Sequence, residues 1–148
     1  LCQEFANHFK DMGIETVIGP ATGGIILSQV TARLLGVRSI FTERENGKMT
    51  LRRGFKVAPG EKVLIVEDIV TTGGSIKEVV DVVNEAKGDI VGIGLLVDRS
   101  GGKADFGVPQ EKVYPLLHLT VPTYKPEECP LCKEGVPITE RGSHHLKK

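Results

Sequence analysis

The most constraining feature of the sequence is an apolar run that passes through two carboxylates into a glycine-containing turn. The run covers residues 63–66, the carboxylates are Glu67 and Asp68, and the turn covers residues 71–75. An uninterrupted apolar run is typical of a strand that is buried on both faces, as strands of parallel sheets are. One-sided apolar spacing over residues 75–87 then predicts an amphipathic helix. Strand, turn and helix in this order indicate an α/β fold.

The rest of the chain repeats this alternation of helices and strands. Glycines that can end a helix follow each helical segment, and the predicted helices with their closing residues are 1–12 (Gly13), 25–35 (Gly36) and 75–87 (Gly88). Short β-prone segments separate them, and the predicted strands are residues 16–18, 38–43, 62–67, 90–97 and 113–119. We therefore expect an α/β fold with a doubly wound, mostly parallel sheet.

Two segments stand outside this alternation. Residues 44–54 are polar and basic and include Gly47, so we expect a flexible basic loop or hairpin there. The last segment contains prolines and the pair Cys129 and Cys132. The expected domains are a core over residues 1–122 and a short C-terminal Pro/Cys tail over residues 123–148.

Composition restricts the class of protein. The 148 residues are 40% apolar and carry no formal net charge, which predicts one soluble domain with a single core and no nucleic-acid or anionic membrane partner. No apolar run approaches the roughly 20 residues of a membrane span. Three cysteines without a signal segment favour the cytoplasm. Because Leu1 already belongs to a helical pattern, we interpret the chain as lacking its natural N-terminus.

The turn after the acid pair has the chemistry of a phosphate site. Glycines allow close approach, and the N–H groups at a helix N-terminus favour a dianion. Glu67 and Asp68 suit sugar hydroxyls, a divalent cation or a developing positive charge, so the run predicts a ribose 5-phosphate site. The alternative is a plain turn with a helix cap and solvated acids. No Walker motif occurs, and the Gly92-x-Gly94 spacing lies inside a predicted strand.

The run over residues 63–75 resembles the ribose-phosphate signature of type I phosphoribosyltransferases. Residues 19–25, 41–55 and 96–99 are similar to further segments of the orotate phosphoribosyltransferase family. The resemblance implies the type I phosphoribosyltransferase fold and Mg²⁺-dependent transfer of ribose 5-phosphate from phosphoribosyl pyrophosphate (PRPP) to orotate. The products would be pyrophosphate and orotidine 5′-phosphate, in pyrimidine biosynthesis. It also implies that an N-terminal hood segment over the base is missing here.

The same resemblance assigns roles to single residues. Glu67 and Asp68 would be catalytic at the ribose, with Mg²⁺ held mainly by substrate and by Asp68 through water. The implied PRPP-binding residues are Glu67, Asp68, Ile69, Val70, Thr71, Thr72, Gly73, Gly74 and Ser75. The implied pyrophosphate loop is Pro20, Ala21, Thr22, Gly23 and Gly24. Thr71 and Arg99 would bind orotate; the alternative for Arg99 is a surface salt bridge.

The basic loop supplies the remaining implied roles. Arg44 and Lys48 would be catalytic toward the leaving pyrophosphate, and the loop over residues 44–53 would be shared across the interface of a homodimer. The alternative is a solvated hairpin, since Glu43 and Glu45 partly offset its basic residues.

Two questions stay open at this point. Cys129 and Cys132 form half of a zinc-ribbon pattern, with His144 and His145 as an uncertain complement, so structural or incidental pairing competes with zinc and with a redox role. The second question is the substrate. The alternatives to orotate are a purine or uracil phosphoribosyltransferase, or a non-enzymatic PRPP-sensing regulator on the same fold.

Overall fold

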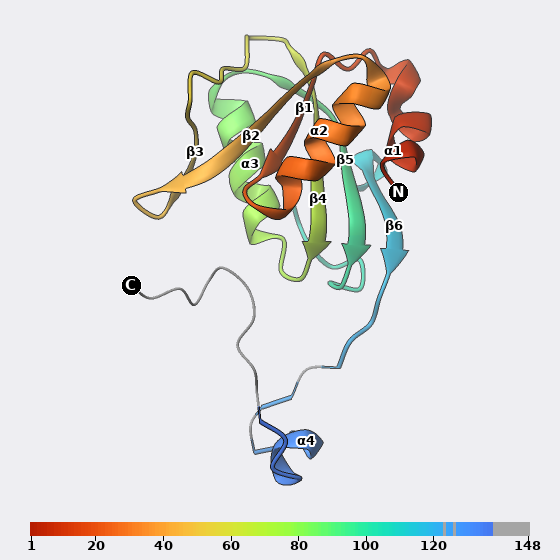
Figure 1. Cartoon of the computed structure of the whole chain (residues 1–148), viewed down its shortest axis with the longest axis vertical. Coiled ribbons are helices and arrows are strands. Elements are labelled where there is room, and N and C mark those ends of the chain that lie inside the picture. Colours follow the sequence, from red (N-terminus) through yellow and green to blue (C-terminus); the bar gives the residue numbers. More distant parts are fainter. Residues whose placement is uncertain (123, 126, 138–148) are drawn as a thin grey trace.

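A computed structural model describes residues 1–122, 124–125 and 127–137 of the chain. Six strands form one sheet in the order β3-β2-β1-β4-β5-β6 (Figure 1). The strands are β1 (Thr16–Pro20), β2 (Arg38–Glu45), β3 (Lys48–Leu51), β4 (Lys62–Val70), β5 (Asp89–Asp98) and β6 (Val113–His118). Every neighbouring pair is parallel except β2 and β3, which form an antiparallel hairpin at the edge. The predicted mostly parallel sheet is confirmed.

Helices cover both faces of this sheet, as a doubly wound fold requires. Figure 1 shows α1 and α2 on one face and α3 on the other. The helices are α1 (Cys2–Phe9), α2 (Gly23–Leu35), α3 (Gly74–Glu85) and α4 (Pro130–Lys133), with 3₁₀ turns over Lys10–Met12 and Gln110–Lys112. In the described ranges, no helix has the length and apolar character of a membrane span.

The apolar run of β4 lies at the centre of both layers of the core. Val63 and Ile65 belong to the cluster under α3, whereas Leu64 and Val66 belong to the cluster under α1 and α2. All four side chains are fully buried. Each contributes about 1.5–3 kcal/mol by leaving water. This two-sided burial explains why the strand has no polar alternation.

The glycines of β5 make room for the aromatic rings of α1. A Cβ on Gly94 would lie 3.0 Å from the Phe5 ring, and one on Gly92 would overlap the ring of Phe9. Both phenylalanines are fully buried. The Gly92-x-Gly94 spacing therefore serves helix–sheet packing.

β4 is longer than the sequence pattern predicts. The expected strand stops at residue 67, but pairing with β5 continues through Ile69 and Val70, which lie opposite Val97 and Asp98. The β-branched side chains of Ile69 and Val70 suit this extended backbone. Consequently Asp68, like Glu67, lies within the strand rather than after it.

The end of α3 also differs from the prediction. The helix stops at Glu85, and the residue with left-handed backbone is Lys87 (φ 60°), not Gly88. Gly88 is small for a different reason, because a Cβ there would lie 2.8 Å from Val57 and from Val83. Gly13 and Gly36 do have the left-handed backbone expected of helix-ending glycines.

The polar segment after β2 forms a hairpin. Asn46 and Gly47 connect β2 to β3 with positive φ angles of 53° and 81°. Both central residues of a type I′ turn need positive φ, and Asn-Gly is its preferred pair. Of the two predicted forms, loop or hairpin, the hairpin is the one observed.

Candidate active site

A cavity of about 260 Å³ opens where β4 meets α3. We call the backbone of residues 71–75 in this cavity the cradle. The wall consists of strand-end, turn and first-turn residues, namely Arg44, Glu67, Ile69, Val70, Thr71, Thr72, Gly73, Gly74, Ser75, Ile76 and Glu78. All predicted PRPP-binding residues except Asp68 therefore line one cavity.

Gly73 has a conformation that only glycine adopts readily. Its φ is 86°, and a Cβ there would lie 2.9 Å from the Phe106 ring. Among the described residues no side chain caps α3, and its first turn contains no acidic residue. The N–H groups at this helix start are therefore available to an anion, which the helix dipole also favours.

The acid pair forms the floor beside the cradle. Glu67 is 7% exposed, and its Oε1 accepts a hydrogen bond from the Asp68 N–H at 3.0 Å. Burial, a hydrogen bond with the Asp68 side chain and the Asp68 charge raise the pKa of Glu67 to about 8, although the Asp68 N–H opposes this. Glu67 therefore keeps a proton at neutral pH.

Asp68 meets the predicted pyrophosphate loop. A Cβ on Gly23 would overlap the Asp68 carboxylate, and the N–H of Ala21 donates to the Thr42 carbonyl at 2.7 Å. The peptide bond between Ala21 and Thr22 is cis. The loop over residues 20–24 thus lies beside the acid pair, although it does not line the cradle cavity.

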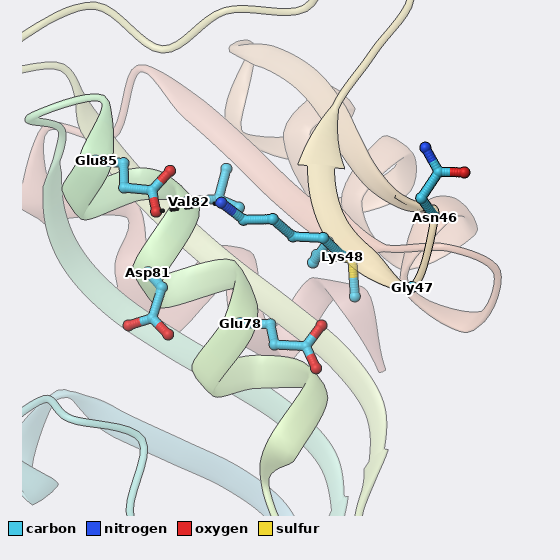
Figure 2. A pocket seen from close by; sticks show the side chains of 8 residues that line it. Asn46, Gly47, Lys48, Glu78, Asp81, Val82 and Glu85 are labelled. Atoms are coloured by element: carbon cyan, nitrogen blue, oxygen red, sulfur yellow. Dashed lines mark ion pairs between the residues drawn. The ribbon is translucent and has the colours of Figure 1, made fainter.

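The two predicted catalytic basic residues lie in different places. Arg44 lines the cradle cavity of its own chain and contacts Glu78 on α3. Lys48 instead lines a second cleft of about 460 Å³ between the hairpin and α3, where its Nζ lies 3.7 Å from Glu85 Oε1 (Figure 2). The structure brings Arg44, but not Lys48, to the cradle.

Arg99 follows β5 directly and lies next to the end of β4. Its backbone N–H donates to the Val70 carbonyl at 2.8 Å. The Nε of its side chain is buried without a hydrogen-bond partner among the described residues. The Asp98 carboxylate accepts N–H bonds from Ser100 and Gly102 and pairs with His118 instead. Asp98, the acid next to Arg99, therefore has other partners.

These contacts also set the charge of Asp98. Burial alone would raise the pKa of Asp98, but the hydrogen bonds from Ser100 and Gly102 and the charge of His118 together lower it. Asp98 stays ionised and fixes the turn after Arg99, so the arginine lies on an ordered segment.

The cysteine pair lies apart from the cradle residues. The N–H of Cys132 donates to Cys129 Sγ at 3.4 Å. Across the described ranges no three or more His, Cys, Asp or Glu side chains are grouped as metal ligands. His144 and His145 lie outside the described residues. Zinc at Cys129 and Cys132 stays a prediction.

Sequence reasoning missed two residues of this region. Glu78 lines both cavities and contacts Arg44, but the helical pattern alone marks it only as a polar position. Phe106 packs against Gly73 from the loop after β5. It is far from the cradle along the chain, so no local sequence pattern indicated this contact.

Comparisons with known proteins agree with this geometry. Residues 3–106 match the family model of the phosphoribosyl transferase domain, so the fold is that of the phosphoribosyltransferase class. The orotate phosphoribosyltransferase of Desulforamulus reducens is 58% identical over 146 residues, which cover 99% of this chain and 75% of the relative. That of Thermotoga maritima is 57% identical over 145 residues, covering 98% and 76%. The chain belongs to the orotate phosphoribosyltransferase family.

Solved structures confirm the fold. Adenine phosphoribosyltransferase from Rhodothermus marinus has a TM-score of 0.65 at 22% identity, covering 80% of this chain and 77% of that one. The Trypanosoma brucei adenine enzyme, in complex with AMP, pyrophosphate and ribose-5-phosphate, has a TM-score of 0.65 at 19% identity, covering 99% and 71%. At such identities the likeness concerns the fold alone.

Proposed function

We propose that this chain transfers ribose 5-phosphate from PRPP to orotate, giving orotidine 5′-phosphate and pyrophosphate in pyrimidine biosynthesis. The observation that carries the proposal is the position of the cradle. It follows the acid pair at the end of β4, in a chain 58% identical to a protein named orotate phosphoribosyltransferase. An anion site and carboxylates side by side suit a sugar phosphate better than either feature alone.

The cradle would hold the 5-phosphate of PRPP. Backbone N–H groups at the start of α3 and the hydroxyls of Thr71, Thr72 and Ser75 supply donors around the cavity. Gly73 lets the backbone turn without a Cβ in the way. Binding the phosphate here places the attached ribose over the carboxyl end of β4.

The acid pair would act on the ribose. Departure of pyrophosphate leaves positive charge on the sugar, and a fixed carboxylate near that carbon stabilises it. Asp68 would accept hydrogen bonds from the ribose hydroxyls. Glu67, whose pKa burial and Asp68 raise to about 8, would contact the ribose beside Asp68.

Mg²⁺ fits this donor set as a substrate-borne ion. Mg²⁺ usually keeps several waters and takes one or two carboxylates together with substrate phosphates. The described residues contain no cage of three or more carboxylates or imidazoles, whereas Glu67 lines the cradle cavity with Asp68 next to it in the chain. Asp68, through water, would hold the ion that PRPP carries. The ion supplies neutralisation of the pyrophosphate charge.

Arg99 would select the base. A buried Nε without a protein partner is costly unless a ligand satisfies it, and the carboxylate of orotate matches a guanidinium in shape and charge. Purines and uracil carry no carboxylate, so a purine or uracil substrate would leave this guanidinium unsatisfied. Thr71, at the end of the cradle nearest β4, would contact the other side of the base.

Several finer points belong to the proposal only. These points are a homodimer with the hairpin over residues 44–53 shared across its interface and a cytoplasmic location. Arg44 already reaches the cradle of its own chain, so the cis arrangement provides a basic residue without a partner.

Pyrophosphate release tests the proposal. The full-length protein is incubated with PRPP and Mg²⁺ and, in turn, with orotate, uracil, hypoxanthine and adenine. Of the four bases, we expect only orotate to cause pyrophosphate release. Release with another base would keep the ribose-phosphate site and reject orotate, and tight PRPP binding without release would indicate a regulator.

A further inference from the structure

An ion pair joins the hairpin to α3 at the edge of the cradle. Arg44 Nη2 donates to Glu78 Oε1 at 2.9 Å, and Arg44 Nη1 lies 2.7 Å from Glu78 Oε2. Nη1 also donates to the carbonyl of Gly47 in the hairpin turn at 3.0 Å. Two donors of the guanidinium are therefore fixed by the helix on one side and by the turn on the other.

Glu78 is an unexpected residue in such a position. It lines the phosphate cavity, where an isolated carboxylate would repel a bound phosphate. Its contact with Arg44 neutralises this charge. Glu78 also lines the second cleft, and Figure 2 shows its side chain on the face of α3 that is turned toward the hairpin.

Stability alone gives little reason for this pair. Both side chains are about two-fifths exposed, at 41% for Arg44 and 38% for Glu78. Exposed ion pairs contribute about 0–1 kcal/mol because water screens them and side-chain entropy opposes them. A two-point contact does, however, restrict the direction of a guanidinium. The geometry therefore indicates that this pair orients the Arg44 side chain rather than stabilises the fold.

We propose that Glu78 is a positioning residue, which aims Arg44 at the phosphates of PRPP in the cradle. This inference rests on the proposed function and names a part of the site that acts through another side chain. Without Glu78, Arg44 would keep its single contact to the turn and would sample orientations that face solvent. Its contribution to binding the phosphate in the cradle would then decline.

The chain offers a matched control in the neighbouring ion pair. Glu85 lies on the same helix and faces Lys48 of the same hairpin, but its side chain and that of Lys48 are 68% and 76% exposed and 3.7 Å apart. Glu85 lines only the second cleft. Glu85→Gln thus removes the same charge from the same contact surface without touching Arg44.

The test compares Glu78→Gln with Glu85→Gln in the full-length protein. Calorimetry gives the Kd for PRPP with Mg²⁺ without any base, and pyrophosphate release gives kcat and KM. We expect Glu78→Gln to lower kcat/KM for PRPP by about 10-fold or more, the range for losing a charged hydrogen bond, and Glu85→Gln to stay within about twofold. Equal effects of the two variants would overturn the proposal.

A double-mutant cycle separates positioning from a structural role. If Glu78 acts through Arg44, adding Glu78→Gln to Arg44→Ala causes no further loss. A further loss of similar size would overturn the proposal. The exchange Arg44→Glu with Glu78→Arg rebuilds the ion pair with the charges reversed, and we expect it to stay impaired; recovery would mean that the pair only fastens the hairpin.

Failure of the proposed function would look different. In that case wild type releases no pyrophosphate with orotate, while the Kd for PRPP still separates Glu78→Gln from Glu85→Gln. Circular dichroism and urea unfolding of each variant show that it is folded.

Discussion

Gly23 at the start of α2 lies directly against the carboxylate of Asp68 on β4. The two residues belong to the predicted pyrophosphate loop and to the acid pair, which are far apart in sequence. β1 and β4 are parallel neighbours in the sheet, so the segments that follow them meet at one edge. The missing side chain of Gly23 lets them meet this closely.

The first prediction concerns this contact. Gly23→Ala should turn the Asp68 carboxylate away from the ribose position, because a Cβ would overlap it. We expect PRPP affinity to fall about as far as in Asp68→Ala, with little change in the free energy of unfolding, since alanine suits a helical backbone. Calorimetric titration measures the affinity. In an Asp68→Ala background the alanine should cause no further loss, and an additive loss would contradict the account.

The second prediction concerns pH. Burial and then Asp68 raise the pKa of Glu67 from 4.5 to about 8. Between these values the folded chain binds the proton more tightly than the unfolded chain, so the free energy of unfolding falls as pH rises. This contribution is fully present below about pH 4.5 and is lost by about pH 8.

Glu67→Gln should remove that slope, because glutamine does not ionise. Urea denaturation of wild type and variant at about pH 5, 7 and 9 measures it. We expect the stability of the variant, relative to wild type, to increase across this range. Parallel curves for the two proteins would show that Glu67 ionises normally in the folded chain.

The third prediction concerns the packing of α1 on β5. Gly92→Ala should destabilise the fold by about 1–3 kcal/mol, because its Cβ would overlap the buried Phe9 ring. The smaller side chain of Phe9→Leu should recover part of this loss in the double variant. Urea midpoints measure both changes. If the losses in free energy of unfolding caused by Gly92→Ala and Phe9→Leu add in the double variant, the two positions do not compete for space.

The fourth prediction concerns thiol reactivity. The N–H of Cys132, and then its thiol, lower the pKa of Cys129, whereas donation to Cys129 raises the pKa of Cys132. Since the thiolate is the reactive form, iodoacetamide should alkylate Cys129 at lower pH than Cys132. Peptide mass spectrometry across a pH series measures this order. Cys129→Ser should make Cys132 react at lower pH, and an unchanged Cys132 profile would exclude the coupling.

The sequence predicts those parts of the fold that depend on local pattern. The apolar run of residues 63–66 required a strand buried on both faces, and its burial on both sides confirms this. Asn46-Gly47 carries a turn preference in its own residues. The phosphate cradle was predictable because turn, glycines and helix start are consecutive.

Other features depend on contacts between distant segments. β4 continues to Val70 because β5 offers partners there, which no local pattern shows. Arg44 and Glu78 are 34 positions apart, and their contact exists because the hairpin lies beside α3. At the end of α3 the left-handed residue is Lys87 rather than Gly88, and Val57 and Val83 leave no room for a Cβ on Gly88.

The most direct test of the account is the effect of Arg99→Ala on the two substrates. If the guanidinium of Arg99 binds the orotate carboxylate, KM for orotate should rise by about 10- to 100-fold, as expected for losing a hydrogen bond to a charged group. Arg99→Lys should recover little, because an ammonium lacks the planar fork. The Kd for PRPP should stay unchanged in both variants. An unchanged KM for orotate, or an equal loss of PRPP binding, would contradict the assignment of Arg99 as the residue that selects orotate.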